Sequence, residues 1–148
     1  MGAPRSLRVL LAGPTGDRLI ALRASVETGP DMLVCAEARD GPAALRIALT
    51  ERPDACLVSV EPGFDAVGVV DTLVEHAPHV SVLLCGEEPD DETLLAAVGM
   101  GASGYVVAGM GAAQLADALF DAVSGYPAFP PRLARLLITR LRDQSQAA

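Results

Sequence analysis

The chain has 148 residues, of which 51% are hydrophobic and 20% charged. This balance is typical of one α/β domain with a substantial core, and it excludes a disordered chain. The formal net charge of −8 argues against nucleic-acid binding by this chain alone. All eleven cationic side chains are arginine, so every mechanism that needs a lysine is excluded. No apolar run reaches the ~18 residues of a membrane span, and we expect a cytoplasmic protein without membrane contact.

Short apolar runs alternate along the chain with segments of helical periodicity. Strands are predicted over Leu7–Ala12, Met32–Ala38, Ala55–Val60, Val80–Cys85 and Gly104–Val107. Helices are predicted over Asp17–Glu27, Pro42–Glu51, Asp65–His76, Asp91–Met100 and Ala112–Val123. Strict alternation with short connections predicts an α/β fold, with a five-stranded parallel sheet and helices on both of its faces.

The expected helices contain apolar positions that we assign to the core. These are Leu19, Ile20, Leu22 and Val26 in the first helix, Leu45, Ile47 and Leu49 in the second, and Leu115, Leu119, Phe120 and Val123 in the fifth. The three cysteines, Cys35, Cys56 and Cys85, all fall in predicted strands. Their odd number and apolar surroundings favour reduced thiols that pack as small hydrophobic side chains.

The end of the chain differs in charge from the rest. Residues 1–131 carry seven arginines against eighteen acids, whereas residues 132–148 carry four arginines against Asp143 alone. A helix is predicted over Arg132–Arg142, with leucines spaced four apart. We therefore place one domain at residues 6–125, and a linker with an amphipathic helix at residues 126–148. This helix either packs back on the domain or connects it to a further domain.

Several candidate sites follow the predicted strands. The loop Gly13–Gly16 has neither P-loop nor dinucleotide-fingerprint spacing, so a tight turn is preferred to a phosphate site. Ser59 has neither a G-x-S-x-G setting nor an evident base, which argues against an enzyme. His76 and His79 have no further ligands at metal-binding spacing.

Four carboxylates also follow strand ends: Glu61, Asp65, Glu87 and Glu88. Such oxygens could hold Mg²⁺ at the carboxyl edge of the sheet. Roles at helix starts and in solvated loops explain them more simply. We therefore expect no metal or cofactor, while Mg²⁺ at Glu61 or Asp65 stays open.

The order of the segments resembles a known family. The chain is similar over residues 7–125 to CheY-like receiver domains of bacterial two-component response regulators, and most closely to the NarL/LuxR-type branch. The resemblance rests on "RVLLA" at 8–12, "PDMLVCAEARDGPAAL" at 30–45, "ERPDACLV" at 51–58 and "GASGYVV" at 101–107. It implies a role in signal transduction and in the regulation of transcription.

The resemblance also implies where a phosphorylation site would be. Such receivers hold Mg²⁺ with two acidic residues after the first strand, and the matching positions are Gly13 and Pro14. Their phosphoryl-accepting aspartate ends the third strand, where this chain has Ser59. The segment after it, "SVEPG", is one residue shorter than the Asp-x-x-x-Pro run of the family.

The remaining positions of this site differ as well. The family's threonine or serine after the fourth strand matches Cys85 or Gly86, and its lysine after the fifth strand matches Ala108. Only the switch aromatic, Tyr105, is retained. The resemblance therefore implies an atypical receiver with a degenerate site, which acts without phosphorylation.

Three hypotheses for its action stay open. The first is a receiver module of a transcriptional regulator that acts as a homodimer, or through a ligand or protein partner. Its DNA contact would come only from a C-terminal helix-turn-helix domain that these 148 residues do not contain. The second is a stand-alone pseudo-receiver adaptor. The third is a sensor that binds a small molecule in a pocket shared by Gly13, Ser59, Cys85 and Ala108.

Overall fold

The computed structural model describes residues 6–147 and contains five strands and six helices. In chain order they are β1 (Leu7–Ala12), α1 (Asp17–Thr28), β2 (Met32–Ala38), α2 (Gly41–Thr50), β3 (Ala55–Ser59), α3 (Ala66–His76), β4 (Ser81–Gly86), α4 (Asp91–Gly99), β5 (Gly104–Val107), α5 (Ala112–Val123) and α6 (Arg132–Ala147). The strands form one parallel sheet in the order β2-β1-β3-β4-β5. The predicted α/β fold with its C-terminal helix is confirmed.

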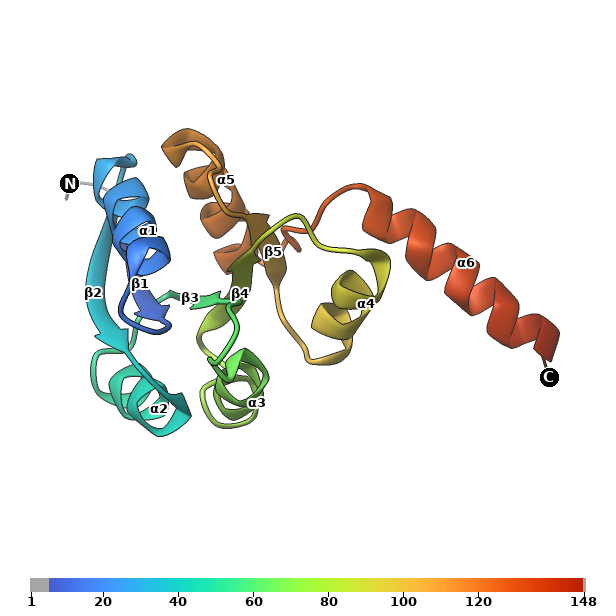
Figure 1. Ribbon diagram of the computed structural model, residues 1–148, viewed down its shortest axis with the longest axis horizontal. Helices are drawn as coiled ribbons and strands as arrows, with labels where there is room; N and C mark the ends of the chain where they lie inside the picture. Colours follow the sequence, from blue (N-terminus) through green and yellow to red (C-terminus); the bar gives the residue numbers. More distant parts are fainter. Residues whose placement is uncertain (1–5, 148) are drawn as a thin grey trace.

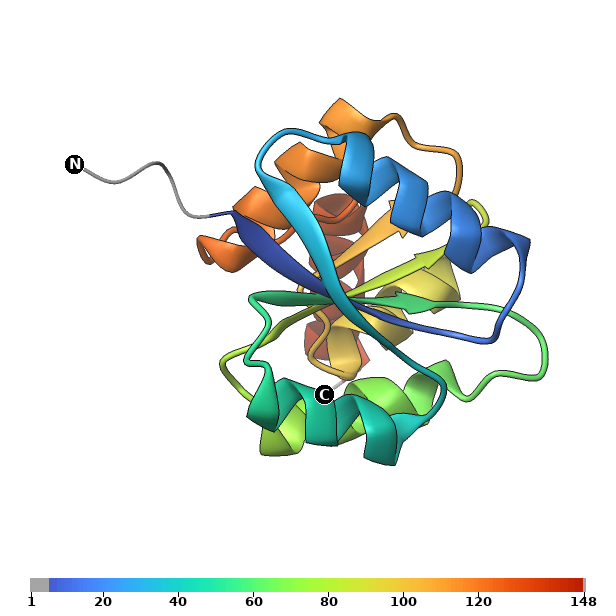
Figure 2. The ribbon, with the colours of Figure 1, turned by 90° about the vertical axis from the view of Figure 1, so that its left-hand side faces the viewer.

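The helices cover both faces of the sheet. Helices α1 and α5 lie on one face, and α2, α3 and α4 lie on the other (Figures 1 and 2). Neighbouring residues of a strand point to opposite faces, so Leu57 joins the α1–α5 core while Cys56 and Val58 join the other core. All five residues of β3 are buried, as expected for the central strand of a sheet covered on both sides.

Four apolar side chains expected in the core lie largely at the surface. Ile20 is 66% exposed and Leu49 51%, while Phe120 is 37% and Val123 38% exposed. The buried stripe of α2 consists of small residues, Ala44 and Ala48, and that of α5 consists of Leu115, Ala116, Leu119 and Ala122. In α1 the buried residues are Leu19, Leu22 and Val26. The expectation for these four side chains is wrong because other residues of each helix form the face that meets the sheet.

The segment after α5 is attached to the edge of the sheet. Ala128 forms a parallel bridge with Gly104, through Tyr105 N–H to Ala128 O at 3.0 Å and Ala128 N–H to Ser103 O at 2.8 Å. A Cβ on Gly104 would lie only 2.5 Å from Ala128 O, so the close approach requires glycine. The predicted division at residues 125 and 126 falls in this segment between α5 and α6.

Helix α6 is longer than predicted and contacts the domain along its first half, through residues such as Leu133, Leu137 and Arg140. Its first turns lie against α4, and the helix then extends away from the domain (Figure 1). Leu133 is buried, whereas Ile138 and Leu141 are exposed. The last residue of the predicted C-terminal segment, Ala148, lies outside the described residues. Among residues 6–147, no helix has the length and apolar character needed to cross a bilayer.

Candidate functional site

The positions singled out in the sequence meet at the carboxyl edge of the sheet. Ser59 ends β3, Gly13 directly follows β1, and Cys85 pairs with Val106 of β5 in the register of β4 and β5. Ser59 is fully buried, and its Oγ donates a hydrogen bond to Glu61 Oε2 at 2.5 Å. The hydroxyl therefore has a partner and no solvent access, which argues against its use as a nucleophile.

Gly13 and Ser59 are packed directly against each other. A Cβ built on Gly13 would lie 2.9 Å from Ser59 Cβ and 3.4 Å from Leu19 Cδ1. The backbone of Gly13 is fixed by the bond from its N–H to Ala38 O at 3.0 Å. With this backbone, the space between β1 and β3 has no room for a carboxylate side chain at position 13. Pro14, the second position that the resemblance matches to an acid, is half-buried.

This packing leads to a prediction for two glycines of the same loop. Gly13→Ala is expected to lower the free energy of unfolding by about 1–3 kcal/mol, because it overpacks a buried contact. Gly16→Ala is the matched control, since a Cβ there has no neighbour within 4 Å. It is expected to cost at most about 1 kcal/mol, because Gly16 is the N-cap of α1 and alanine is a poorer N-cap residue. Urea unfolding measures both, and equal effects of the two substitutions would contradict the close packing.

Arg18 places a positive charge at this edge, and sequence reasoning missed it. Its Nη1 donates to Val60 O at 2.6 Å, and its Nη2 to Glu87 Oε1 at 2.6 Å. The guanidinium thus bridges the loops that follow β3 and β4. One signal was present in the sequence: Arg18 lies in the first turn of α1, where the helix dipole disfavours a cation. A residue in that place needs a compensating partner elsewhere.

The side chain of Tyr105, on β5, points into the protein. Its ring is buried, and its hydroxyl donates to Glu87 O at 2.7 Å. A Cβ on Gly86 would lie 2.6 Å from this hydroxyl, so glycine at position 86 leaves the space that the phenol fills. Burial is the main cause that raises the pKa of Tyr105 above its ordinary value.

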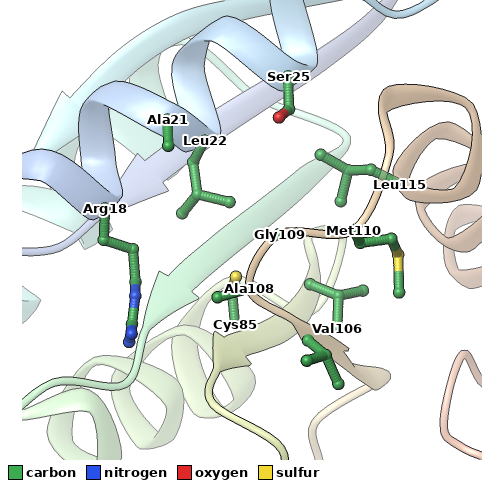
Figure 3. A pocket seen from close by; sticks show the side chains of 11 residues that line it. Arg18, Ala21, Leu22, Ser25, Cys85, Val106, Ala108, Gly109, Met110 and Leu115 are labelled. Carbon is green, nitrogen blue, oxygen red and sulfur yellow. The ribbon is translucent and has the colours of Figure 1, made fainter.

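Cys85 and Ala108 line a separate cavity between α1 and the loop before α5 (Figure 3). Its volume is about 70 Å³, and its walls are mostly apolar, with Leu22, Val106 and Leu115 around it. Burial raises the pKa of the Cys85 thiol to about 11, so this thiol is protonated at neutral pH. The predicted pocket shared by all four residues is therefore wrong, because Gly13 and Ser59 close against each other outside this cavity.

The four candidate metal-binding carboxylates all have protein partners. Glu61 accepts from Ser59, and Asp65 caps α3 by accepting from Gly68 N–H at 2.9 Å. Glu87 pairs with Arg18, and Glu88 pairs with Arg132 at 2.8 Å. Within residues 6–147, no group of three or more His, Cys, Asp or Glu side chains could hold a metal ion.

The two histidines contact different parts of the chain. His76 Nε2 is 3.8 Å from Glu75 Oε2, while His79 Nε2 is 3.0 Å from Ala48 O. Both side chains are exposed at the end of α3 or just after it. These contacts are those of surface residues near a helix end.

No family model matches the sequence. The transcriptional regulatory protein LiaR of Bacillus subtilis is 28% identical over 143 residues, which cover 96% of this chain and 68% of LiaR. The DNA-binding transcriptional activator DevR/DosR of Mycobacterium tuberculosis is 29% identical over 118 residues, which cover 79% of this chain and 54% of DevR/DosR. The nitrate/nitrite response regulator NarL of Escherichia coli K12 is 26% identical, covering 79% of this chain and 55% of NarL.

Solved structures agree with these relatives. The response regulator ChrA of a heme-sensing two-component system has a TM-score of 0.71 at 28% identity, over 93% of this chain and 66% of ChrA. This chain has the receiver fold, and its homologues are response regulators. A LuxR-family regulator from Aurantimonas sp. SI85-9A1 has a TM-score of 0.77 at 24% identity, over 92% of this chain and 99% of that structure. The receiver thus spans about two thirds of LiaR and ChrA, and little more than half of DevR/DosR and NarL.

Proposed function

We propose that this receiver belongs to a NarL/LuxR-type transcriptional regulator and transmits its signal without being phosphorylated. The direct packing of Gly13 on Ser59 carries the proposal, because it fills the space where an acidic pair and an acceptor carboxylate would meet. Ser59, Gly13 and Pro14 then represent the degenerate acceptor and acidic positions. Cys85, Gly86 and Ala108 represent the degenerate threonine and lysine positions.

The chemistry of phosphoryl transfer supports this proposal. Transfer to a carboxylate needs that carboxylate, a divalent cation, and a positive group for the developing charge. Ser59 offers a buried hydroxyl that already donates to Glu61, and the chain contains no lysine. Two arginines lie at this edge and both have partners: Arg18 donates to Val60 O and Glu87, and Arg39 donates to Gly13 O and Glu37. We infer a non-enzymatic signalling domain without metal or cofactor.

A homodimer is the expected working form of this domain. The face of α4 and β5 is partly covered by α6 and by residues 127–129 of the same chain. On α5, by contrast, Phe120 and Val123 are exposed large apolar side chains. We therefore place the dimer contact on α5 rather than on α4 and β5. DNA contact would require the helix-turn-helix domain that these 148 residues do not contain, and we place the protein in the cytoplasm.

The alternative of small-molecule sensing has one observation in its favour. The cavity at Cys85 and Ala108 gives a ligand a place beside the carboxyl edge. At about 70 Å³ it holds only a few heavy atoms, so a ligand of metabolite size would need the α1–α5 gap to widen. The adaptor hypothesis has no structural observation that favours it over the regulator.

Binding of a phosphoryl mimic tests the proposal. Beryllium fluoride with Mg²⁺ is expected to leave the thermal unfolding midpoint unchanged, because Gly13 and Ser59 provide no carboxylates to hold either ion. A midpoint that rises by several degrees and saturates with the concentration of the mimic would contradict the proposal. Samples with Mg²⁺ alone and with fluoride alone are the controls.

A further inference from the structure

One loop contacts both the carboxyl edge and the C-terminal helix. Residues 87–89, between β4 and α4, bind side chains from α1, β5 and α6. We propose that this loop couples the position of Arg18 to the docking of α6, so that a change at the carboxyl edge alters the direction of the C-terminal helix. The coupling needs no phosphoryl group, and it does not depend on the proposed function.

From α6, Arg132 binds this loop through several contacts. Its Nη1 donates to Glu88 Oε1 at 2.8 Å, its Nη2 donates to Pro89 O, and its Nε is 3.7 Å from Asp91 Oδ1. Arg132 is the first residue of α6, so these contacts fix the point and the direction from which the helix leaves. Arg140, two turns later, makes one longer contact with Glu92 at 3.3 Å.

At the edge of the sheet, Glu87 accepts two hydrogen bonds. Its carboxylate receives Arg18 Nη2 at 2.6 Å, and its carbonyl receives the Tyr105 hydroxyl at 2.7 Å. Pro89, two residues on, is buried, and its ring restricts the backbone. A movement of Glu87 is therefore expected to move Glu88 and Pro89 as well, because the backbone between these residues has little freedom to adjust.

Helix α6 depends on these contacts for its order. It has 16 residues, a length at which an isolated helix is only marginally stable in water. Leu133 is its only buried side chain among the described residues of the helix. The bridge between Ala128 and Gly104 anchors the chain just before α6. Leu136 and Leu137 are half-buried against the same core as Leu133, and Arg140 pairs with Glu92, so the contacts of Arg132 with residues 88 and 89 set the helix axis together with this packing.

Hydrogen exchange on the whole chain tests the coupling. Arg132→Gln is expected to speed amide exchange over residues 134–141 by about tenfold, because it weakens the docking of the helix. Arg18→Gln and Glu87→Gln are expected to speed exchange in the same residues by roughly threefold or more, although neither contacts α6. Arg23→Gln is the matched control: Arg23 is also on α1 and pairs with Glu27 and Glu37, away from the loop. It is expected to leave α6 unchanged.

The double variant decides between coupling and general loosening. If Arg18 and Glu87 act through one contact, the Arg18→Gln/Glu87→Gln protein exchanges no faster in α6 than either single variant. Glu87 is highly exposed, so Glu87→Gln tests the contact even if Arg18→Gln disturbs folding. Unchanged exchange in α6 for Glu87→Gln, or equal acceleration by Arg23→Gln, would overturn the coupling. Unchanged exchange in α6 for Arg132→Gln would show that the contacts of Arg132 with Glu88 and Pro89 do not hold the helix.

Discussion

Ser59→Asp is expected to lower the free energy of unfolding by roughly 3 kcal/mol, and it is not expected to create a phosphoryl acceptor. Ser59 is fully buried, and its Oγ lies 2.5 Å from Glu61 Oε2. An aspartate there would place a second negative charge beside Glu61 without solvent. Burial and the like charge would both raise the pKa of the new carboxyl. A raised pKa favours the protonated folded protein, so the variant should regain stability as the pH falls.

Ser59→Ala is the control for this substitution. It removes the hydroxyl without adding a charge, and it should cost no more than about 1.5 kcal/mol, the loss expected for one hydrogen bond. Urea unfolding at pH 7 and pH 5 measures both variants. A Ser59→Asp protein as stable as the parent at pH 7, or one that accepts a phosphoryl group, would show that the edge is open rather than closed.

Gly86→Thr should displace Tyr105 from its inward position. A Cβ at position 86 would lie 2.6 Å from the Tyr105 hydroxyl and 3.0 Å from Val60 Cβ, so the phenol must move. The loss of packing and of the bond to Glu87 O is expected to cost about 1–3 kcal/mol. Urea unfolding measures this cost.

The titration of Tyr105 gives a second measurement on the same variant. The chain has two tyrosines and no tryptophan, so Tyr126→Phe leaves Tyr105 as the only phenol. Its pKa, raised by burial in the parent, should fall toward the ordinary value in Gly86→Thr. In the parent, the raised pKa means that stability present below the ordinary tyrosine pKa is lost as the pH rises through and above it. Identical phenol titrations in the two proteins would contradict the inward placement.

The strands and most helices could be predicted because their signals are local. Leu7–Ala12 and Met32–Ala38 are apolar runs whose limits coincide with β1 and β2. The burial of Leu49 and Phe120 was mispredicted because hydrophobicity alone does not say which helix face meets the sheet. In α2 that face is set by Ala44 and Ala48, which pack under the helix only once the sheet has formed.

The geometry of the site depends on contacts between distant parts of the chain. Arg18 meets Val60 and Glu87, which are 42 and 69 residues away, and no local pattern specifies these pairs. The resemblance placed Gly13 and Ser59 at matched positions, but a shared pocket was expected there. Their direct packing across β1 and β3 is a tertiary contact, and it became visible only in the structure.

Arg18 gives this edge a permanent internal cation. Its guanidinium is 19% exposed at the side-chain level, and it bridges a backbone carbonyl and a carboxylate. A fixed cation cannot be gained or lost as a bound metal ion can. In the proposed account, a signal at this edge therefore comes from association, from a ligand in the neighbouring cavity, or from movement of the Arg18–Glu87 contact.

Exposure of the purified protein to acetyl phosphate with Mg²⁺, followed by intact mass measurement, tests the central claim most directly. The proposed account predicts an unchanged mass at every time point, because the packing of Gly13 on Ser59 leaves no acceptor carboxylate and no metal site. Near-stoichiometric addition of an acid-stable but base-labile phosphoryl group, mapped to a carboxylate at the carboxyl edge of the sheet, would contradict it.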